Sequence, residues 1–480
     1  MSNPTLQVYG GDEVSAVIID PGSYVTNIGH AGTDCPQVSV PSQYGHYTKE
    51  KEGEESKSKK VFAEQSIGFP RADYEIKPIV ENGVITDWDA AQEQWQWALE
   101  KEMFMDSNKG TAALLTEPIW NPVANRKKSL EVLLEGLDFG ACYLSSGPTC
   151  VSFAAGRPNC LVVDVGHDTC SVSPVVDGMT LSKSTVRSPF AGKYINHLLE
   201  KYLAPRDIVP LFAVAQKRPD FKKKEFDFEV SPSLYSYANN HEVFQEMKET
   251  LCQVSPDGPL DTMKESLEKQ AKRSIETHWG ENIVFDNVTR YGFAEQLFAV
   301  NEADIPDDFD FSKDGTVETW HNDYVPLKRN KPNSGNKDTS VAPSEPSAAP
   351  EEQTNENGKR AMQDETESKK NEIYGLTDLV YASIMEADVD LRASLAHNIV
   401  LTGGSSQIPG LSDRLMHDLG SRLQALKFRI LTAGNSRERQ YQSWLGGSIL
   451  ASLGTFHQLW VGKEEYTEVG PDRLLNERFR

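Results

Sequence analysis

The 480-residue sequence contains no run of eighteen or more apolar residues, so it has no segment typical of a membrane-spanning helix. Residues 1–11 show neither a basic region nor an apolar signal core, and we expect the protein to stay inside the cell. The six cysteines form no Cys-x-x-Cys pair and have no histidine cluster nearby, which argues against zinc and disulfides and favours reduced, mostly buried thiols. A Gly-x-x-x-x-Gly-Lys-Ser/Thr loop is also absent, so any phosphate site must have another architecture.

Positive charge is scarce: the sequence has 49 Lys and Arg residues and 71 Asp and Glu residues, which gives a net charge of -22. Non-specific DNA affinity depends mainly on Lys and Arg displacing counterions, so we do not expect direct DNA binding. Basic partners such as histones or a cationic helix are favoured, although net charge alone identifies no partner. The length suggests two or three globular units.

Two segments share one pattern of apolar run, Asp-x-Gly, tight turn and returning strand. The first runs from Val14 to Ile19 and turns at Asp20-Pro21-Gly22-Ser23. The second runs from Leu161 to Val163 and turns at Asp164-Val165-Gly166-His167. The repetition predicts two β-hairpins in corresponding halves of a duplicated domain.

Helical periodicity appears between the hairpins, at residues 92–104 and 126–137. A third apolar strand at 399–401 leads into Thr402-Gly403-Gly404-Ser405 and then a helix at 411–419. Helices therefore alternate with strands, and the glycine pair resembles a ligand loop at the carboxyl end of a strand.

Two segments differ in composition. Residues 301–371, above all from Asn330 on, are polar and proline-rich, and we expect a largely disordered insertion. Its basic clusters at 328–332, 359–360 and 369–370 fit nuclear import signals and ordinary solvated surface equally well. The Lys/Glu run at 49–60 predicts an exposed loop.

Two facing Asp-x-Gly turns could clamp a magnesium nucleotide. Tight turns direct backbone N–H groups toward an anion, and Asp20 and Asp164 could hold Mg²⁺ through its water shell. Either turn alone is more simply an ordinary hairpin, where Asp and Gly are favoured. Two copies together with the Gly403-Gly404 loop favour the phosphate site.

The order of these motifs resembles the actin family over nearly the whole chain, except 301–371 and 49–60. The same resemblance extends to Leu114-Leu115-Thr116-Glu117-Pro118, Asn125-Arg126 and the block from Tyr441 to Leu450. Residues 93–97, His167-Asp168 and the ending Phe479-Arg480 resemble, more closely, the nuclear actin-related proteins of fungi.

The resemblance implies an α/β, actin-like duplicated ATPase fold, with two lobes of two subdomains each around a cleft for ATP and Mg²⁺. Subdomain 1 would comprise 1–41, 75–154 and 442–480, and subdomain 2 would comprise 42–74. Subdomain 3 would comprise 155–190 and 290–441, interrupted by the insertion, and subdomain 4 would comprise 191–289. The implied adenosine contacts are Lys248, Glu249, Gly404, Ser405, Gln407 and Ile408, and the implied phosphate contacts are Gly22, Ser23, Gly166, His167 and Asp168. Gly403 and the carboxylates of Asp20 and Asp164 complete the implied cofactor site.

Departures from the family bear on catalysis. Asn27 stands where actin has a phosphate-binding lysine, and loss of one charge-assisted hydrogen bond, roughly 1.5–3 kcal/mol, would weaken affinity about ten- to a hundredfold. Gln245 and Gln440 replace two further cations. Gly147 and Ser171 replace the glutamine and histidine that position the attacking water, so we expect no catalytic residues and persistent ATP. His167 is the one compensating candidate, although a lone histidine in a turn is more often a surface or phosphate-contacting group than a base.

The resemblance also implies partners. The charged 49–60 run would be costly to desolvate in a filament contact, which favours a monomeric subunit of a hetero-oligomer. An apolar partner groove falls on Phe153, Ala154, Gly156, Met179, Leu450, Leu453 and Thr455, although these residues could merely pack the hinge. The implied partners are the helicase-SANT-associated helix of a remodelling ATPase or acetyltransferase scaffold, actin itself, and histones.

The resemblance, together with these departures, therefore implies an ATP-binding, non-hydrolysing subunit of nuclear chromatin-remodelling and histone-acetyltransferase complexes. The alternatives are a slow actin-like ATPase and a filament-forming cytoskeletal relative.

Overall fold

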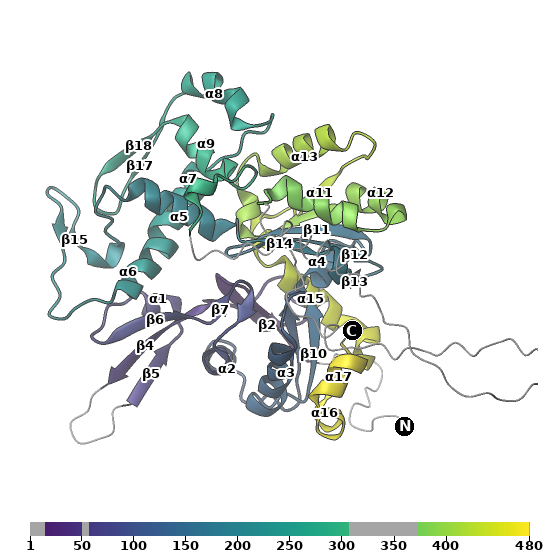
Figure 1. The fold of residues 1–480 in the computed structure, drawn as a ribbon. Helices are drawn as coiled ribbons and strands as arrows, with labels where there is room; N and C mark the ends of the chain where they lie inside the picture. The colour runs from purple at the N-terminus through teal and green to yellow at the C-terminus, as the bar shows by residue number, and fades with distance from the viewer. Residues whose placement is uncertain (1–14, 50–56, 307–372, 480) are drawn as a thin grey trace, which may run out of the picture.

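The computed structural model describes residues 15–49, 57–306 and 373–479, and its elements are arranged around two six-stranded sheets (Figure 1). In the first sheet the strand order is β21-β10-β9-β1-β2-β3. The strands β1, β9 and β10 are parallel, and β1, β2 and β3 form an antiparallel meander. Their bounds are β1 Ala16–Pro21, β2 Val25–His30, β3 Val38–Pro41, β9 Ala112–Glu117, β10 Ala141–Ser146 and β21 Val461–Gly462.

The second sheet repeats this plan. Its order is β13-β12-β11-β19-β20, with β14 beside β12. The hairpin β11–β12 is antiparallel and β11 pairs with β19 in parallel, as β1 pairs with β2 and β9. The predicted hairpins are thus confirmed, with bounds β11 Cys160–Val165, β12 Cys170–Val176, β13 Met179–Thr180, β14 Val186–Ser188, β19 Ile399–Thr402 and β20 Ile430–Thr432.

Both faces of each sheet are buried, as the continuous apolar runs require. In β1, Val17 and Ile19 face one core and Ile18 faces another, because successive side chains of a strand point to opposite faces. The first core contains α2 (Trp88–Trp97) and α3 (Val123–Glu131), which continue into π-helical turns at Ala98–Glu102 and Val132–Gly136. The predicted helices at 92–104 and 126–137 are confirmed, and the first begins earlier because Asp87 caps it by accepting a hydrogen bond from the Ala90 N–H.

Helices α4 (Gly147–Ala154) and α15 (Gln442–Ser452) pack against each other between the two sheets. Gly446 makes this possible, since a Cβ there would lie 1.7 Å from the Cys150 carbonyl oxygen. A Cβ at the neighbouring Gly447 would lie 3.0 Å from the Ile18 side chain. The two glycines thus allow α15 to approach α4 and β1 more closely than any other residue would.

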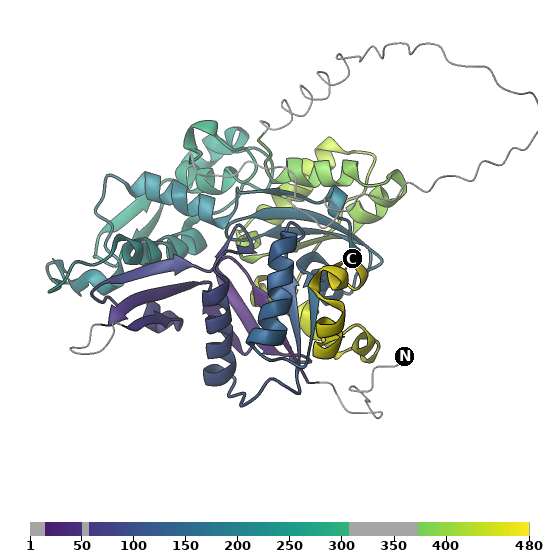
Figure 2. The same cartoon turned by 60° about the horizontal axis from the view of Figure 1, so that its bottom comes forward.

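The remaining elements extend the two halves. A sheet of order β5-β4-β6 lies at one end of the first half, and helices cover the second half (Figures 1 and 2). The predicted loop at 49–60 is wrong at its ends, because Lys49 ends β4 and residues 57–60 belong to β5. Residues 50–56 lie outside the described part. The bounds are β4 Gln43–Lys49, β5 Lys57–Val61, β6 Tyr74–Pro78, α1 Glu64–Ile67, α5 Gly192–Leu203, β15 Val214–Gln216, β16 Lys222–Lys223, α6 Pro232–Ala238, α7 Gln245–Leu251, α8 Leu260–Glu268, β17 Arg273–Glu276, β18 Asn282–Phe285, α9 Asn287–Glu295, α11 Leu376–Glu386, α12 Val389–His397, α13 Leu411–Arg422, α14 Ser436–Gln440, α16 Lys463–Val469 and α17 Pro471–Glu477.

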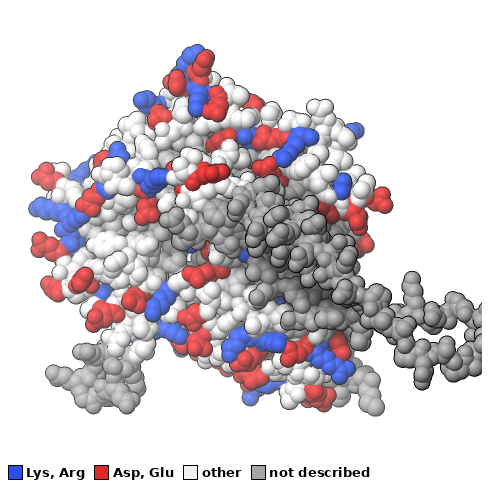
Figure 3. Space-filling model, in the orientation of Figure 1, with Lys and Arg blue, Asp and Glu red and all other residues white. Residues whose placement is uncertain are grey.

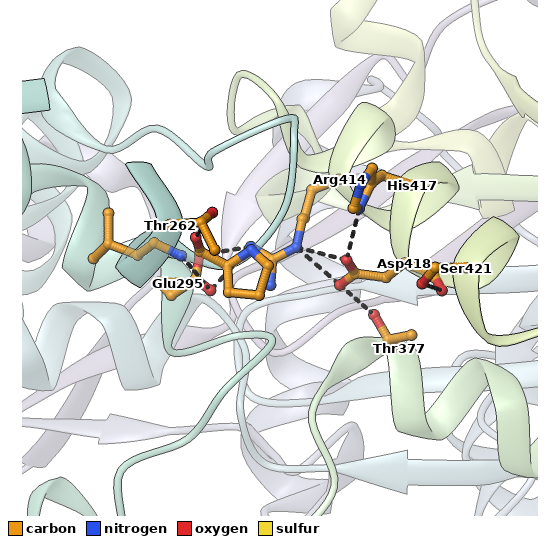
Figure 4. A network of polar contacts seen from close by, with 9 residues as sticks. Thr262, Glu295, Thr377, Arg414, His417, Asp418 and Ser421 are labelled. Atoms are coloured by element: carbon orange, nitrogen blue, oxygen red, sulfur yellow. Dashed lines mark hydrogen bonds and ion pairs between the residues drawn. The ribbon is translucent and has the colours of Figure 1, made fainter. Parts of the chain in front are cut away.

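A buried ionic network ties α9, α11 and α13 together (Figure 4). The Arg414 guanidinium, 3% exposed, donates to both carboxylate oxygens of Glu295 at 2.9 and 2.7 Å and to Asp418 at 2.8 Å. Asp418 also accepts from the Thr377 hydroxyl. Because every charge is paired, removing one partner would leave a buried carboxylate uncompensated.

Most of the predicted insertion lies outside the described residues, including its three basic clusters. Its first residues are described and include a short 3₁₀ turn at Glu302–Asp304. The four-subdomain division stays a prediction. No described helix is both long and apolar enough to cross a bilayer. Five of the six cysteines are buried free thiols, and Cys35 is exposed.

Candidate functional site

A cavity of about 770 Å³ lies between the two sheets, at the turns where their hairpins reverse. A volume of this size is typical of small-molecule sites. The structure brings thirteen of the fourteen predicted binding residues to its lining, which are Asp20, Gly22, Ser23, Asp164, Gly166, His167, Lys248, Glu249, Gly403, Gly404, Ser405, Gln407 and Ile408. The remaining one, Asp168, is buried beside the second turn and does not line the cavity.

The two turns share one backbone hydrogen bond at equivalent positions. The Gly22 N–H donates to the Val25 carbonyl at 3.1 Å, and the Gly166 N–H donates to the Thr169 carbonyl at 3.0 Å. These bonds occupy the glycine N–H groups. A bound anion would therefore accept hydrogen bonds from the N–H groups of the other residues in each turn.

The carboxylates of Asp20 and Asp164 lie close enough to interact electrostatically. Burial raises the pKa of Asp20, against hydrogen bonds from side chains including Thr116 and Asn27. Burial, followed by the nearby charge of Asp20, raises the pKa of Asp164 to about 6. Two partly buried carboxylates, both disfavoured as anions by burial, fit a cation near them, so the pair suits Mg²⁺. Among the described residues no cluster of three metal-ligating side chains occurs, so most ligands of such an ion would be water and phosphate oxygens.

The glycine loop after β19 packs directly on Asp164. Gly403 has φ of 90°, and a Cβ there would lie 2.3 Å from Asp164 Oδ1. Ser405 donates through its hydroxyl to the Gly166 carbonyl at 2.8 Å. The loop thus supports the second turn, and only glycine fits at 403.

A third turn, between β7 (Val80–Glu81) and β8 (Val84–Ile85), binds both hairpin turns. The Asn82 N–H donates to Asp168 Oδ2 at 3.0 Å, and the Gly83 N–H donates to Ser23 Oγ at 3.1 Å. Asp168 therefore acts on the site by fixing the turn, and its carboxylate is already engaged.

Lys248 supplies positive charge on the other wall. Its ammonium donates to Asn196 Oδ1 at 3.1 Å and to the Gly192 carbonyl at 3.4 Å, and burial lowers its pKa to about 8. Sequence reasoning missed Arg439, which also lines the cavity beside Gln440. Nothing in the local sequence distinguishes Arg439 from Arg437, the exposed cation of the same short helix.

The hydrolysis positions are also in place. Gly147 and Ser171 line the cavity, where the former offers no side chain and the latter only a hydroxyl. The pKa of His167 is held well below 6.5 by burial and then by the charge of Lys248. Its ring packs 4.9 Å from the ring of Tyr24, which favours a packing role, not anticipated from the sequence, over that of a base.

The predicted partner residues gather where α4 and α15 end. Met179 is 68% exposed and Leu453 is 40% exposed, whereas Leu450 is 8% exposed and belongs to a core. Phe153 is half-buried against the same core, near the β12–β13 turn. Of the other residues, Ala154 is half-buried, and Gly156 and Thr455 are exposed.

Comparisons with known proteins agree with this architecture. The family model described as Actin matches residues 11–480. The chain is 64% identical over 494 residues to Actin-related protein 4 of Saccharomyces cerevisiae, covering 100% of both chains. It is 38% identical to Actin-related protein 4 of Candida albicans, with 99% of each chain covered, and 33% identical to that of Schizosaccharomyces pombe, with 98% of each covered. A duplicated α/β fold with a cavity between its halves and a family match of this extent lead to one conclusion: the chain belongs to the actin family.

Proposed function

We propose that the chain is an ATP-binding, non-hydrolysing structural subunit of nuclear chromatin-remodelling and histone-acetyltransferase complexes. One observation supports the nucleotide-binding part of this proposal. The cavity brings together two phosphate-type turns, a carboxylate pair and Lys248, but it has only Gly147 and Ser171 at the hydrolysis positions. Asp20 and Asp164 would hold Mg²⁺, which neutralises phosphate charge when bound. The backbone N–H groups of both turns would orient the phosphates, and Lys248 with Glu249 would contact the adenosine.

Turnover is not needed for such a role. The cavity is lined from both sheets, so a bound nucleotide stabilises the native state by mass action, about 2.7 kcal/mol at a hundred times Kd. A single-turnover assay with γ-labelled ATP tests the absence of hydrolysis. We expect one nucleotide bound per chain and no phosphate released on the timescale at which actin, run alongside, completes its turnover. Phosphate release at the rate of actin would refute the proposal and favour a slow ATPase.

The proposed partner binding rests on the exposed apolar residues at the ends of α4 and α15 and on the relatives named Actin-related protein 4. A long scaffold helix of the helicase-SANT-associated type, beside actin, is the proposed occupant. Met179→Asp and Leu453→Asp should each weaken capture of a synthetic helix together with actin at least tenfold. Leu211→Asp, an exposed apolar position on the second half, is the matched control, and equal loss in all three variants would contradict the site.

The proposed histone contact is not tied to one surface. Acidic and basic side chains are interspersed over the face shown in Figure 3, apart from a basic group over β15. A nuclear location is proposed on the same grounds as the complexes, and fractionation of cells expressing the tagged chain tests it.

A further inference from the structure

Four rings contact one another in sequence from the cavity, the first pair tilted at 50° and the next two pairs stacked. The ring of His167 lies 4.9 Å from that of Tyr24, centroid to centroid. Tyr24 stacks on His241 at 4.4 Å with an interplanar angle of 13°, and His241 stacks on Tyr237 at 4.2 Å with an angle of 26°. We call this set the ring stack.

The ring stack joins elements on opposite sides of the cavity. Tyr24 belongs to the β1–β2 turn of the first sheet, and His167 belongs to the β11–β12 turn of the second; both line the cavity. Tyr237 lies on α6, and His241 lies on the π-helical turn Asn239–Phe244 that follows it. The stack therefore links the first half to the helices that cover the second half.

A second contact links the same two halves. The Ile76 N–H of β6 donates to the Ser233 hydroxyl of α6 at 2.9 Å, and Figure 1 shows α6 lying against β6 and α1. His241 stays neutral near pH 7 because burial lowers its pKa to about 4, so it stacks as an uncharged ring. The halves cannot separate on this side without breaking both contacts.

We propose that the ring stack is a latch that retains nucleotide by holding the two halves closed. The inference rests on the proposed nucleotide site and adds Tyr24, His241 and Tyr237 as the residues that set the rate of release. A ligand held between the two halves loses contacts with one of them when they part, and parting requires Tyr24 to leave His241. Aromatic pairs in this geometry contribute beyond the area that they bury.

The test measures dissociation of a fluorescent ATP analogue, chased with excess ATP, from the full chain. His241→Leu should release it about tenfold faster, equivalent to about 1.4 kcal/mol of barrier. His241→Phe keeps a stacking ring and should stay within twofold of the parent. Tyr237→Leu tests the outer end of the stack and should accelerate release if His241→Leu fails to fold. Tyr381→Leu, on α11, is the control.

The outcomes separate the two proposals. Equal rates in the parent, His241→Leu and Tyr237→Leu, with one analogue bound per chain, would overturn the latch and leave the nucleotide site standing. No binding of the analogue by the parent would overturn the nucleotide site, and the latch with it.

Discussion

Replacing Asp164 with asparagine should stabilise the nucleotide-free protein, although it removes a predicted ligand. Asp164 has its pKa raised from 3.8 to about 6 by burial and by Asp20. Above pH 6 the Asp164 carboxylate is therefore ionised in both states, but its charge is less stable in the folded state than in the unfolded state. A shift of about two pKa units corresponds to about 3 kcal/mol of lost stability. This loss is complete above the folded-state pKa of about 6 and absent below the unfolded-state pKa of 3.8. Asp164→Asn should recover up to about that amount at pH 8 and little at pH 4.

The same variant should respond less to ligand. Mg²⁺ with ATP relieves the repulsion between the two carboxylates in the parent, whereas Asp164→Asn offers one charge fewer to the cation. Urea unfolding at pH 4 and pH 8, with and without magnesium ATP, measures both effects. Asp177→Asn, at an exposed turn with φ of 51°, makes the same change outside the cavity and should stay within about 0.5 kcal/mol. A variant less stable than the parent at pH 8 without ligand, or equally stabilised by magnesium ATP, would refute the reasoning.

Two further predictions concern the scaffold. Gly446→Ala should destabilise the protein by at least about 3 kcal/mol, because its Cβ overlaps the Cys150 carbonyl. Gly420→Ala has no atom within 4 Å of its Cβ and should raise the free energy of unfolding by up to about 1 kcal/mol, as measured by thermal or urea unfolding. Equal effects of the two would contradict the close helix contact. Arg414→Met should cost about 3–5 kcal/mol by leaving buried carboxylates unpaired, whereas Arg473→Met, in an exposed pair, should change stability by less than about 1 kcal/mol. Similar urea midpoints for these two variants would refute the buried network.

The hairpins and the glycine loop were predictable because each is encoded locally. An apolar run, an Asp-x-Gly turn and a returning strand specify a hairpin. The carboxyl ends of parallel strands lie at one edge of a sheet, so β11 and β19 place Asp164 and Gly403 close together. The predicted loop at 49–60 was wrong at its ends for a physical reason. β5 is an edge strand of its sheet, and its lysines are typical of edges that avoid further pairing, although they also suggest a loop.

The ring stack could not be predicted from sequence. Its members come from four elements separated by up to 217 positions, from Tyr24 to His241, and none belongs to a recurring pattern. Arg439 was missed for a related reason, since its place in the cavity depends on how α14 meets the loop after β19. Contacts of this kind depend on tertiary packing, which local propensity does not encode.

Helices α4 and α15 each begin at the cavity, at Gly147 and Gln442, and end among the exposed residues around Leu453. Each thus runs from the cavity to the proposed partner surface, and the eleven residues of α15 span about 16 Å. Thermodynamic reciprocity then applies: if a scaffold helix prefers one relative placement of these two helices, the factor by which it strengthens ATP binding equals the factor by which ATP strengthens its own docking.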